Sequence, residues 1–261
     1  MSADDAPRLV ELAGEGFVAE IVLSNPPLNL VTRAMLRQLD RLLAGLARRE
    51  DLRCLILHGG EARAFCAGSD IGEFAGLRED ASAKKILIED MVLRQLARLP
   101  IPTIAAIDAP ALGGGLELAL ACDLRVLRAG VRIGLPECQL GGLAGTGAVR
   151  LTRLIGPARA KQMLFTGATI DSDAALAWGL VDEVTEGSAL GAARRLAATI
   201  GERGPLSNRL AKELVDLSED APLDAALVRA SVAQRAIFES DDLHEGAAAF
   251  FAKRSPVFTG R

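Results

Sequence analysis

The sequence contains no tyrosine, only two histidines and few aromatic residues, which make up 3% of its 261 residues. The absence of tyrosine excludes any mechanism that needs a catalytic phenol, including the tyrosine–lysine pair of one large class of dehydrogenases. The two histidines, His58 and His244, are too far apart in the sequence to suggest a metal motif. We expect both to be surface residues rather than catalysts.

The chain also lacks an excess of positive charge, long apolar runs and paired cysteines. A net charge of -4, together with the scarcity of aromatic rings, argues against a nucleic-acid surface. No apolar run reaches membrane-spanning length, and the first residues lack the basic flank and apolar core of a signal peptide. We therefore expect a cytoplasmic protein without membrane contact. Cys54, Cys66, Cys122 and Cys138 are widely spaced, which favours free thiols over disulfides or zinc.

The composition is that of a globular protein, with 50% hydrophobic and 25% charged residues. Strands are expected at 17–23, 52–57, 103–107 and 180–184, with two short strands within 124–134. Helices are expected from Thr32 as a cap to Leu46, near 70, and at 84–99, 147–154, 157–165, 171–178, 207–217, 221–238 and 242–251. In the helix at 84–99, the apolar face is expected to include Ile86, Ile88, Met91, Leu93 and Leu96. Strands alternating with helices, followed by helices alone after Ser188, predict an α/β core with a helical tail.

Three consecutive glycines, Gly113 to Gly115, follow the strand expected at 103–107 and open an apolar helix. A glycine turn before a helix leaves free backbone N–H groups at the positive end of the helix dipole, where they can hold an anion or an oxygen that becomes one. A second loop that leads into a helix, 67–70, could add another N–H group to the same oxygen if the fold brings the two together. For each glycine cluster, the alternative is an ordinary tight turn.

Glu117 is the only charged residue between Leu112 and Cys122. It lies three residues after Gly114, which places both on the same side of the first helical turn, with the carboxylate beside the free N–H groups. The alternative is that Glu117 only complements the helix dipole.

Glu137 follows a proline and lies in weakly polar surroundings. Together with Glu117 it could divide the roles of acid and base. Alternatively, Glu137 is a loop glutamate paired with Arg132 or Arg150. Asp70 can equally be a helix N-cap or a ligand contact.

Four motifs, taken in order and spacing, resemble the enoyl-CoA hydratase/isomerase family, also called the crotonase family. They are FCAGSDI at 65–71, APALGGGLELALACD at 109–123, the Pro136-Glu137 loop and GLVDEV at 179–184. The resemblance implies an α/β fold built as a crotonase-like spiral of ββα units with a C-terminal helical segment. It divides the chain into a core with an acyl-CoA site at 1–200 and a helical oligomerisation segment at 201–261. It further implies homotrimers, commonly paired into hexamers.

The resemblance also implies roles for individual residues. Glu117 and Glu137 match the two catalytic glutamates of the hydratases, and Gly114 matches one oxyanion donor. The other donor is expected at Ala67, although some relatives use the residue corresponding to Ser69. Substrate contacts are expected at Gly68, Ser69, Asp70 and Gly145, the last holding the catalytic water. Ala144 stands where proline is frequent, and the loop before Arg150 is one residue short, which leaves the acyl-chain preference open.

The expected function is therefore the reversible addition of water to a 2-enoyl-CoA thioester in fatty acid metabolism. No metal or other cofactor is expected, because coenzyme A is part of the substrate. The alternatives are a double-bond isomerase or another acyl-CoA lyase and, in a different class, a non-catalytic RNA-binding relative. Retention of both glutamates favours hydration, since an isomerase that shuttles one proton can work with a single base.

Overall fold

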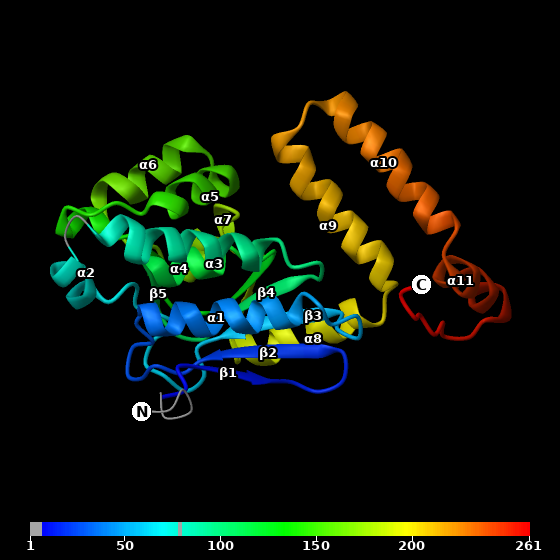
Figure 1. Ribbon diagram of the computed structural model, residues 1–261, viewed down its shortest axis with the longest axis horizontal. Helices are drawn as coiled ribbons and strands as arrows, with labels where there is room; N and C mark the ends of the chain where they lie inside the picture. Colours follow the sequence, from blue (N-terminus) through cyan, green and yellow to red (C-terminus); the bar gives the residue numbers. More distant parts are fainter. Residues whose placement is uncertain (1–6, 78–79) are drawn as a thin grey trace.

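The computed structural model describes residues 7–77 and 80–261 (Figure 1). Its main sheet has the strand order β1-β2-β3-β4-β6-β8, in which only the β1–β2 pair is antiparallel. The central strands β3 and β4 are buried along their whole length, as is usual for parallel strands covered on both faces. The strands are β1 (Val10–Ala13), β2 (Val18–Leu23), β3 (Cys54–His58), β4 (Thr103–Ile107), β6 (Leu124–Arg128) and β8 (Glu183–Thr185).

A second, smaller layer runs beside the main sheet. It contains β5 (Ala111–Leu112) paired with β7 (Ile133–Gly134), and isolated bridges extend it on both sides, from Cys66 to Ala111 and from Ile133 to Ile170. Successive parallel strands of the main sheet are thus followed by a short stretch in the second layer and then by a helix. This arrangement is the spiral of ββα units that the family resemblance implies, and it confirms the expected fold class.

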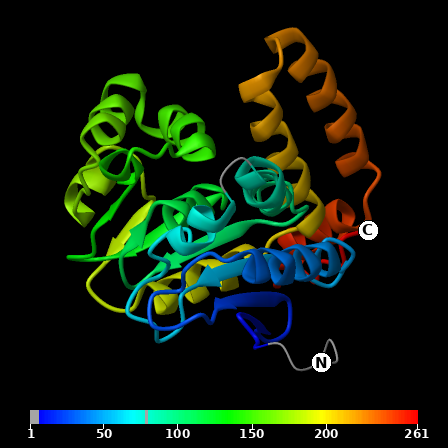
Figure 2. The same ribbon diagram turned by 60° about the vertical axis from the view of Figure 1, so that its left-hand side comes forward.

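The helices cover both faces of the main sheet and continue beyond it. Helices α9 and α10 form a pair that projects from the core, and α11 follows at the end of α10 opposite the α9–α10 turn, where the chain comes back toward the core (Figures 1 and 2). No helix among the described residues is long and apolar enough to cross a membrane. The helices are α1 (Arg33–Leu46), α2 (Ile71–Leu77), α3 (Leu87–Ala97), α4 (Gly114–Leu120), α5 (Gly145–Ile155), α6 (Pro157–Thr166), α7 (Ser172–Ala177), α8 (Ala189–Gly201), α9 (Pro205–Asp220), α10 (Leu223–Phe238) and α11 (Asp241–Ala252), with a π-helical turn at Ser82–Ile86 and a 3-10 turn at Glu137–Leu140.

Alternation along the central strands divides the core in two. In β3, Leu55 and Leu57 point into the larger cluster with α1, α3 and α4, whereas Cys54 and Ile56 point to the opposite face. On that face they meet α8, whose buried positions are four alanines and Gly201, so that this helix lies close against the sheet. All seven residues of α4 are buried, so this short helix lies entirely within the core.

Most expected elements are present, with boundaries shifted by a few residues. Thr32 caps α1 as predicted, since its hydroxyl accepts a hydrogen bond from the Met35 N–H group at 3.1 Å. Strand β1 was not predicted, because its own sequence pattern does not indicate a strand. It is defined by its antiparallel pairing with β2. The cysteines of the described chain are free, as expected.

Two predictions about burial are wrong. In the helix expected at 84–99, Ile86 and Met91 are about half exposed, at 46% and 49%, whereas Lys85 and Glu89 are buried. His58 is also buried rather than on the surface, because it ends β3 beside Glu20 of β2, with 3.5 Å between His58 Nε2 and the Glu20 carboxylate. Burial lowers the pKa of His58.

We predict that Gly115→Ala destabilises the protein by at least about 3 kcal/mol, because a methyl group at Gly115 would lie 2.0 Å from the Cys66 carbonyl oxygen. Gly45→Ala in α1 is the control, since a methyl group there meets nothing within 4 Å. The control should be neutral or stabilising by up to about 1 kcal/mol. Urea unfolding followed by circular dichroism measures both variants. Equal midpoints would contradict the packing of α4 described above.

Candidate active site

The two glycine-containing turns lie against each other, as the sequence predicted they might. Cys66 and Ala111 form a parallel bridge, and the Leu112 N–H group donates to the Cys66 carbonyl oxygen at 3.0 Å. A methyl group built on Gly68 would lie 3.7 Å from the Gly114 nitrogen. The start of α4 and the loop before α2 therefore form one wall.

Two backbone N–H groups in this wall, those of Gly114 and Ser69, have no acceptor among the described residues. Gly114 is the first residue of α4, so its N–H group has no partner within the helix. Ser69 lies opposite Val31, but the two backbone hydrogen bonds to Val31 are made by its neighbours. The Gly68 carbonyl accepts from the Val31 N–H group, and the Asp70 N–H group donates to the Val31 carbonyl. The Ser69 N–H group is left free for a ligand.

Ala67, the expected second donor, cannot serve in this geometry. Its N–H group already donates to the Leu28 carbonyl oxygen at 3.0 Å. The positive φ of Gly68, 106°, turns the chain after Ala67 so that the next N–H group to face Gly114 is that of Ser69. The prediction of Ala67 is therefore wrong, and the alternative residue, Ser69, has the free donor.

Glu117 is buried in α4, and its carboxylate is hydrogen-bonded to residues of another helix, α5. Its Oε1 atom accepts hydrogen bonds from the Thr146 hydroxyl at 2.8 Å and from the Gly147 N–H group at 2.6 Å. The carboxylate of Glu117 therefore contacts the start of α5. This position follows from close packing, because a methyl group on Gly147 would approach Glu117 Oε1 to 2.9 Å.

Glu137 opens the 3-10 turn after β7 and is half-buried. Its Oε2 atom is buried without a hydrogen-bond partner within the described chain, and Oε1 would lie 2.9 Å from a methyl group on Gly113. Gly113 has a φ of 52°, so glycine is favoured there for its backbone as well as for this approach. Burial raises the pKa of Glu137 to about 6, with a smaller contribution from the charge of Glu117.

The ion pair considered for Glu137 is not formed. Arg132 donates to Thr169 instead, and neither Arg132 nor Arg150 forms a salt bridge with Glu137. A loop glutamate paired with arginine would have an ordinary or lowered pKa, whereas the surroundings of Glu137 raise its pKa. Glu137 therefore remains available for proton transfer.

A third carboxyl group, that of Glu89 in α3, reaches the same wall and was missed by the sequence analysis. The Ser69 hydroxyl donates to Glu89 Oε1 at 3.0 Å, and only 8% of Glu89 is exposed. Burial first, and then the charge of Glu117, raise the pKa of Glu89 to about 7. The signal was present in the spacing of Lys85, Glu89, Val92 and Leu96, which form the buried side of this helix.

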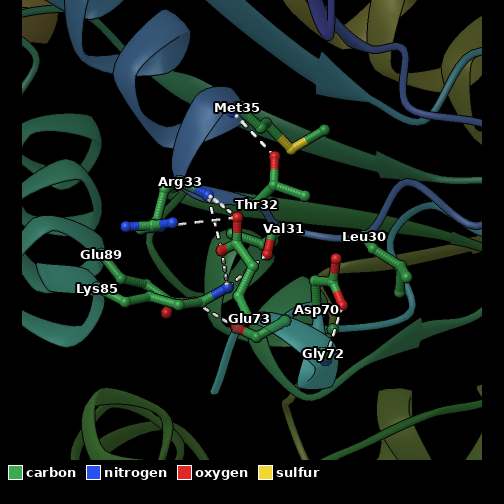
Figure 3. Close-up of polar contacts among 12 residues, drawn as sticks. Leu30, Val31, Thr32, Arg33, Met35, Asp70, Gly72, Glu73, Lys85 and Glu89 are labelled. Carbon is green, nitrogen blue, oxygen red and sulfur yellow. Dashed lines mark hydrogen bonds and ion pairs between the residues drawn. The ribbon is translucent and has the colours of Figure 1, made fainter. Parts of the chain in front are cut away.

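Lys85 fixes the helix that carries Glu89. Its buried amine donates to the Val31 carbonyl oxygen at 2.8 Å and to the Glu73 carboxylate at 3.0 Å (Figure 3). The same carboxylate accepts from the Arg33 N–H group, so α1, α2 and the turn before α3 meet at Glu73. Because Val31 also pairs with Ser69, this network ties the helix to the free N–H group.

The remaining predicted residues lie around this wall with different local roles. Asp70 accepts a hydrogen bond from the Gly72 N–H group at 2.9 Å, which is the behaviour expected of a helix cap. Gly145 begins α5, and a methyl group there would meet nothing within 4 Å, so it borders open space. Thr146 and Gly147 had not been predicted. No group of three or more metal-ligating side chains occurs within the described ranges.

Comparison with known proteins gives consistent results along the whole chain. A family model described as "Enoyl-CoA hydratase/isomerase" matches residues 13–261. An enoyl-CoA isomerase/hydratase of Mycosarcoma maydis is 37% identical, covering 96% of this chain and 94% of its own, and a short-chain-enoyl-CoA hydratase of Clostridium acetobutylicum is 34% identical, covering 94% and 95%. The crystal structure of an enoyl-CoA hydratase from Bacillus anthracis superposes with a TM-score of 0.93 at 33% identity, covering 97% of this chain and 100% of its own.

The raised pKa of Glu137 predicts a pH-dependent effect on stability. The pKa of Glu137 is about 6 in the folded chain, whereas the ordinary value of 4.5 applies to the unfolded chain. Above pH 6 the carboxyl group is ionised in both states, and its ionisation destabilises the folded one. Well below pH 4.5 it is protonated in both states, and the effect vanishes. Glu137→Gln should therefore unfold at a higher urea concentration than the wild type at pH 8, with a much smaller gain at pH 4.5. Glu11→Gln on the exposed β1 is the control. A gain that is the same at both pH values would contradict the burial of this carboxyl group.

Proposed function

The chain belongs to the enoyl-CoA hydratase/isomerase family, and we propose that it catalyses the reversible addition of water to the double bond of a 2-enoyl-CoA thioester. The observation that carries the proposal is that two free N–H groups, from Ser69 and Gly114, lie in one wall, while Glu117 comes from the same helix as Gly114 and the Glu137 carboxyl group approaches Gly113. This set can polarise a carbonyl group and manage the protons of a water molecule.

The N–H groups act on the thioester oxygen. When water adds at C3, negative charge moves through C2 onto that oxygen, and preorganised donors stabilise the enolate that forms. Removing one such donor typically lowers kcat about 10²–10³-fold. The two donors come from rigid backbone, so they need no rearrangement as the charge develops.

The two carboxyl groups divide the proton transfers. Glu117, an acceptor in both of its hydrogen bonds, takes a proton from water while the oxygen bonds to C3. Glu137, whose pKa is raised to about 6, gives its proton to C2. The proton gained by Glu117 then replaces the one lost from Glu137 through solvent, so that no proton is consumed over a turnover. The reaction needs no metal and no cofactor beyond the coenzyme A of the substrate.

An isomerase of the same family is the second candidate. A 3-enoyl substrate would need only one base to move a proton between C2 and C4, whereas two carboxyl groups with separate surroundings suit hydration. The acidic chain does not favour RNA as a ligand.

The C-terminal helices support the expected homotrimer or homohexamer. They expose several large apolar residues that a second copy of the chain could cover, and that packing, like the cytoplasmic location, remains a prediction. These residues are Leu223, Leu227, Val228, Val232, Phe238, Phe250 and Phe251.

We predict that the purified protein removes the enoyl thioester absorbance of crotonyl-CoA or a longer homologue. Glu137→Gln should lower kcat about 10²–10⁴-fold, because the amide cannot supply a proton to C2. Near-native turnover of this variant would remove Glu137 from the mechanism. If no 2-enoyl substrate reacts while a 3-enoyl-CoA is converted, the isomerase is correct.

We also predict that Thr146 acts as a positioning residue for Glu117. Thr146→Val removes the hydroxyl at nearly constant volume and should lower kcat/KM about 10- to 100-fold, the effect of losing a hydrogen bond to a charged group. KM should change little, since the hydroxyl orients the base. Thr146→Ser restores the donor and should restore most of the rate; if both variants are equally slow, the methyl group and not the hydroxyl is what matters.

A further inference from the structure

Glu89 has no part in the two-carboxyl mechanism, yet it reaches the backbone donors. A methyl group built on Gly114 would lie 3.0 Å from Glu89 Oε1, 3.1 Å from Ser69 Oγ and 3.5 Å from the Ser69 nitrogen. These polar atoms therefore lie together beside the Cα atom of Gly114, the residue whose N–H group is free. A thioester oxygen bound by the two N–H groups would be next to the Glu89 carboxyl group.

The hydrogen bonds of Glu89 leave one oxygen free. Oε1 accepts from the Ser69 hydroxyl, whereas Oε2 has no partner among the described residues. A carboxylate at this point would repel the negative charge that develops on the thioester oxygen. A neutral carboxyl group would instead have a proton to donate, as in oxyanion sites where an apolar setting keeps an acid protonated.

We infer that Glu89 is a third donor of the oxyanion site: it accepts from Ser69 through Oε1 and presents a proton on Oε2 to the thioester oxygen. The inference rests on the proposed function, since it needs a thioester bound at Ser69 and Gly114. It makes Glu89 a catalytic residue, because the proton would touch the reacting carbonyl.

The charged groups that face Glu89 favour its neutral form on balance. Glu117 from α4 and Glu137 from the loop after β7 oppose a third negative charge, and burial has the largest effect, which together raise the pKa of Glu89 to about 7. The charge of Lys85, one turn earlier in the chain, lowers the pKa of Glu89, but the Lys85 amine is already bonded to Glu73 and Val31.

Two substitutions separate a donor from a structural contact. Glu89→Gln keeps a donor and cannot ionise, whereas Glu89→Leu removes the donor at similar volume. Asp90→Asn, the adjacent position on the outer side of α3, is a control for the loss of one negative charge. Ser69→Ala removes the hydroxyl but keeps the N–H group and Glu89, so it reports what the Ser69–Glu89 contact alone contributes.

We expect Glu89→Leu to lower kcat for hydration about 10²-fold at pH 6, and Ser69→Ala to have a smaller effect. Above pH 8 the wild-type kcat/KM should fall by an additional factor of about ten per pH unit compared with that of Glu89→Gln, because only the wild type loses the Glu89 proton. Asp90→Asn should follow the wild type. Equal losses in Glu89→Leu and Ser69→Ala would show that Glu89 acts only through Ser69 and would overturn the inference.

A readout without turnover tests Glu89 separately from the proposed function. The infrared carbonyl band of bound [1-¹³C]butyryl-CoA, a saturated thioester, should lie at lower frequency in the wild type than in Glu89→Leu at pH 6. Should the leucine variant not fold, the wild-type band should shift back above pH 8 while that of Glu89→Gln stays. An unchanged band in either comparison overturns the third donor, whereas failure to hydrate any 2-enoyl-CoA contradicts only the proposed function.

Discussion

The short parallel pairing of Cys66 with Ala111 is the constraint on which the site depends. It brings the loop before α2 against the turn before α4, two segments separated by more than forty residues, and on each side it leaves one N–H group that has no acceptor in the described part of the chain. Glycine is required where they touch, because Gly115 lies against the Cys66 carbonyl with no room for a side chain. The second layer of the spiral thus has a function that its few residues would not suggest. It sets the distance between two backbone donors, while the main sheet supplies the stability that keeps them rigid.

Burial of acidic side chains around these donors lowers the stability of the folded chain, but it also provides carboxyl groups that can hold a proton. Glu89 and Glu137 lose hydration and feel the charge of Glu117, which raises the pKa of each carboxyl group and lowers the stability of the folded chain above neutral pH. Such an arrangement persists where protonation is useful, since a carboxyl group whose pKa lies close to physiological pH can give or share a proton. Glu117 differs from these two residues, because its Oε1 atom accepts hydrogen bonds from the Thr146 hydroxyl and the Gly147 N–H group. The same residue type therefore has different surroundings at three positions around one site.

Much of the fold and part of the site could be predicted from the sequence. The helix-forming patterns and the cap at Thr32 were correct because they depend on local chemistry, and the two glycine turns, whose meeting the sequence left open, do lie against each other. Ala67 and Ser69 could not be distinguished, since the choice depends on which N–H group the chain turn at Gly68 leaves unpaired. Glu89 was missed because a glutamate in a helix normally faces solvent, and only the tertiary contacts of α3 reveal that its buried side contains charged residues.

The network around Glu73 explains why that buried side is polar. A buried lysine is unfavourable unless its charge and its donors are satisfied, and Lys85 meets both needs through Glu73 and the Val31 carbonyl. Val31 is at the same time the partner of Ser69 in the second layer. The helix is therefore fixed by polar groups at one end and by Val92 and Leu96 at the other, and Glu89 lies between them. An apolar anchor in place of Lys85 could pack as well, but it would not tie the register of α3 to the strand that presents Ser69. The position of the third carboxyl group follows from that link.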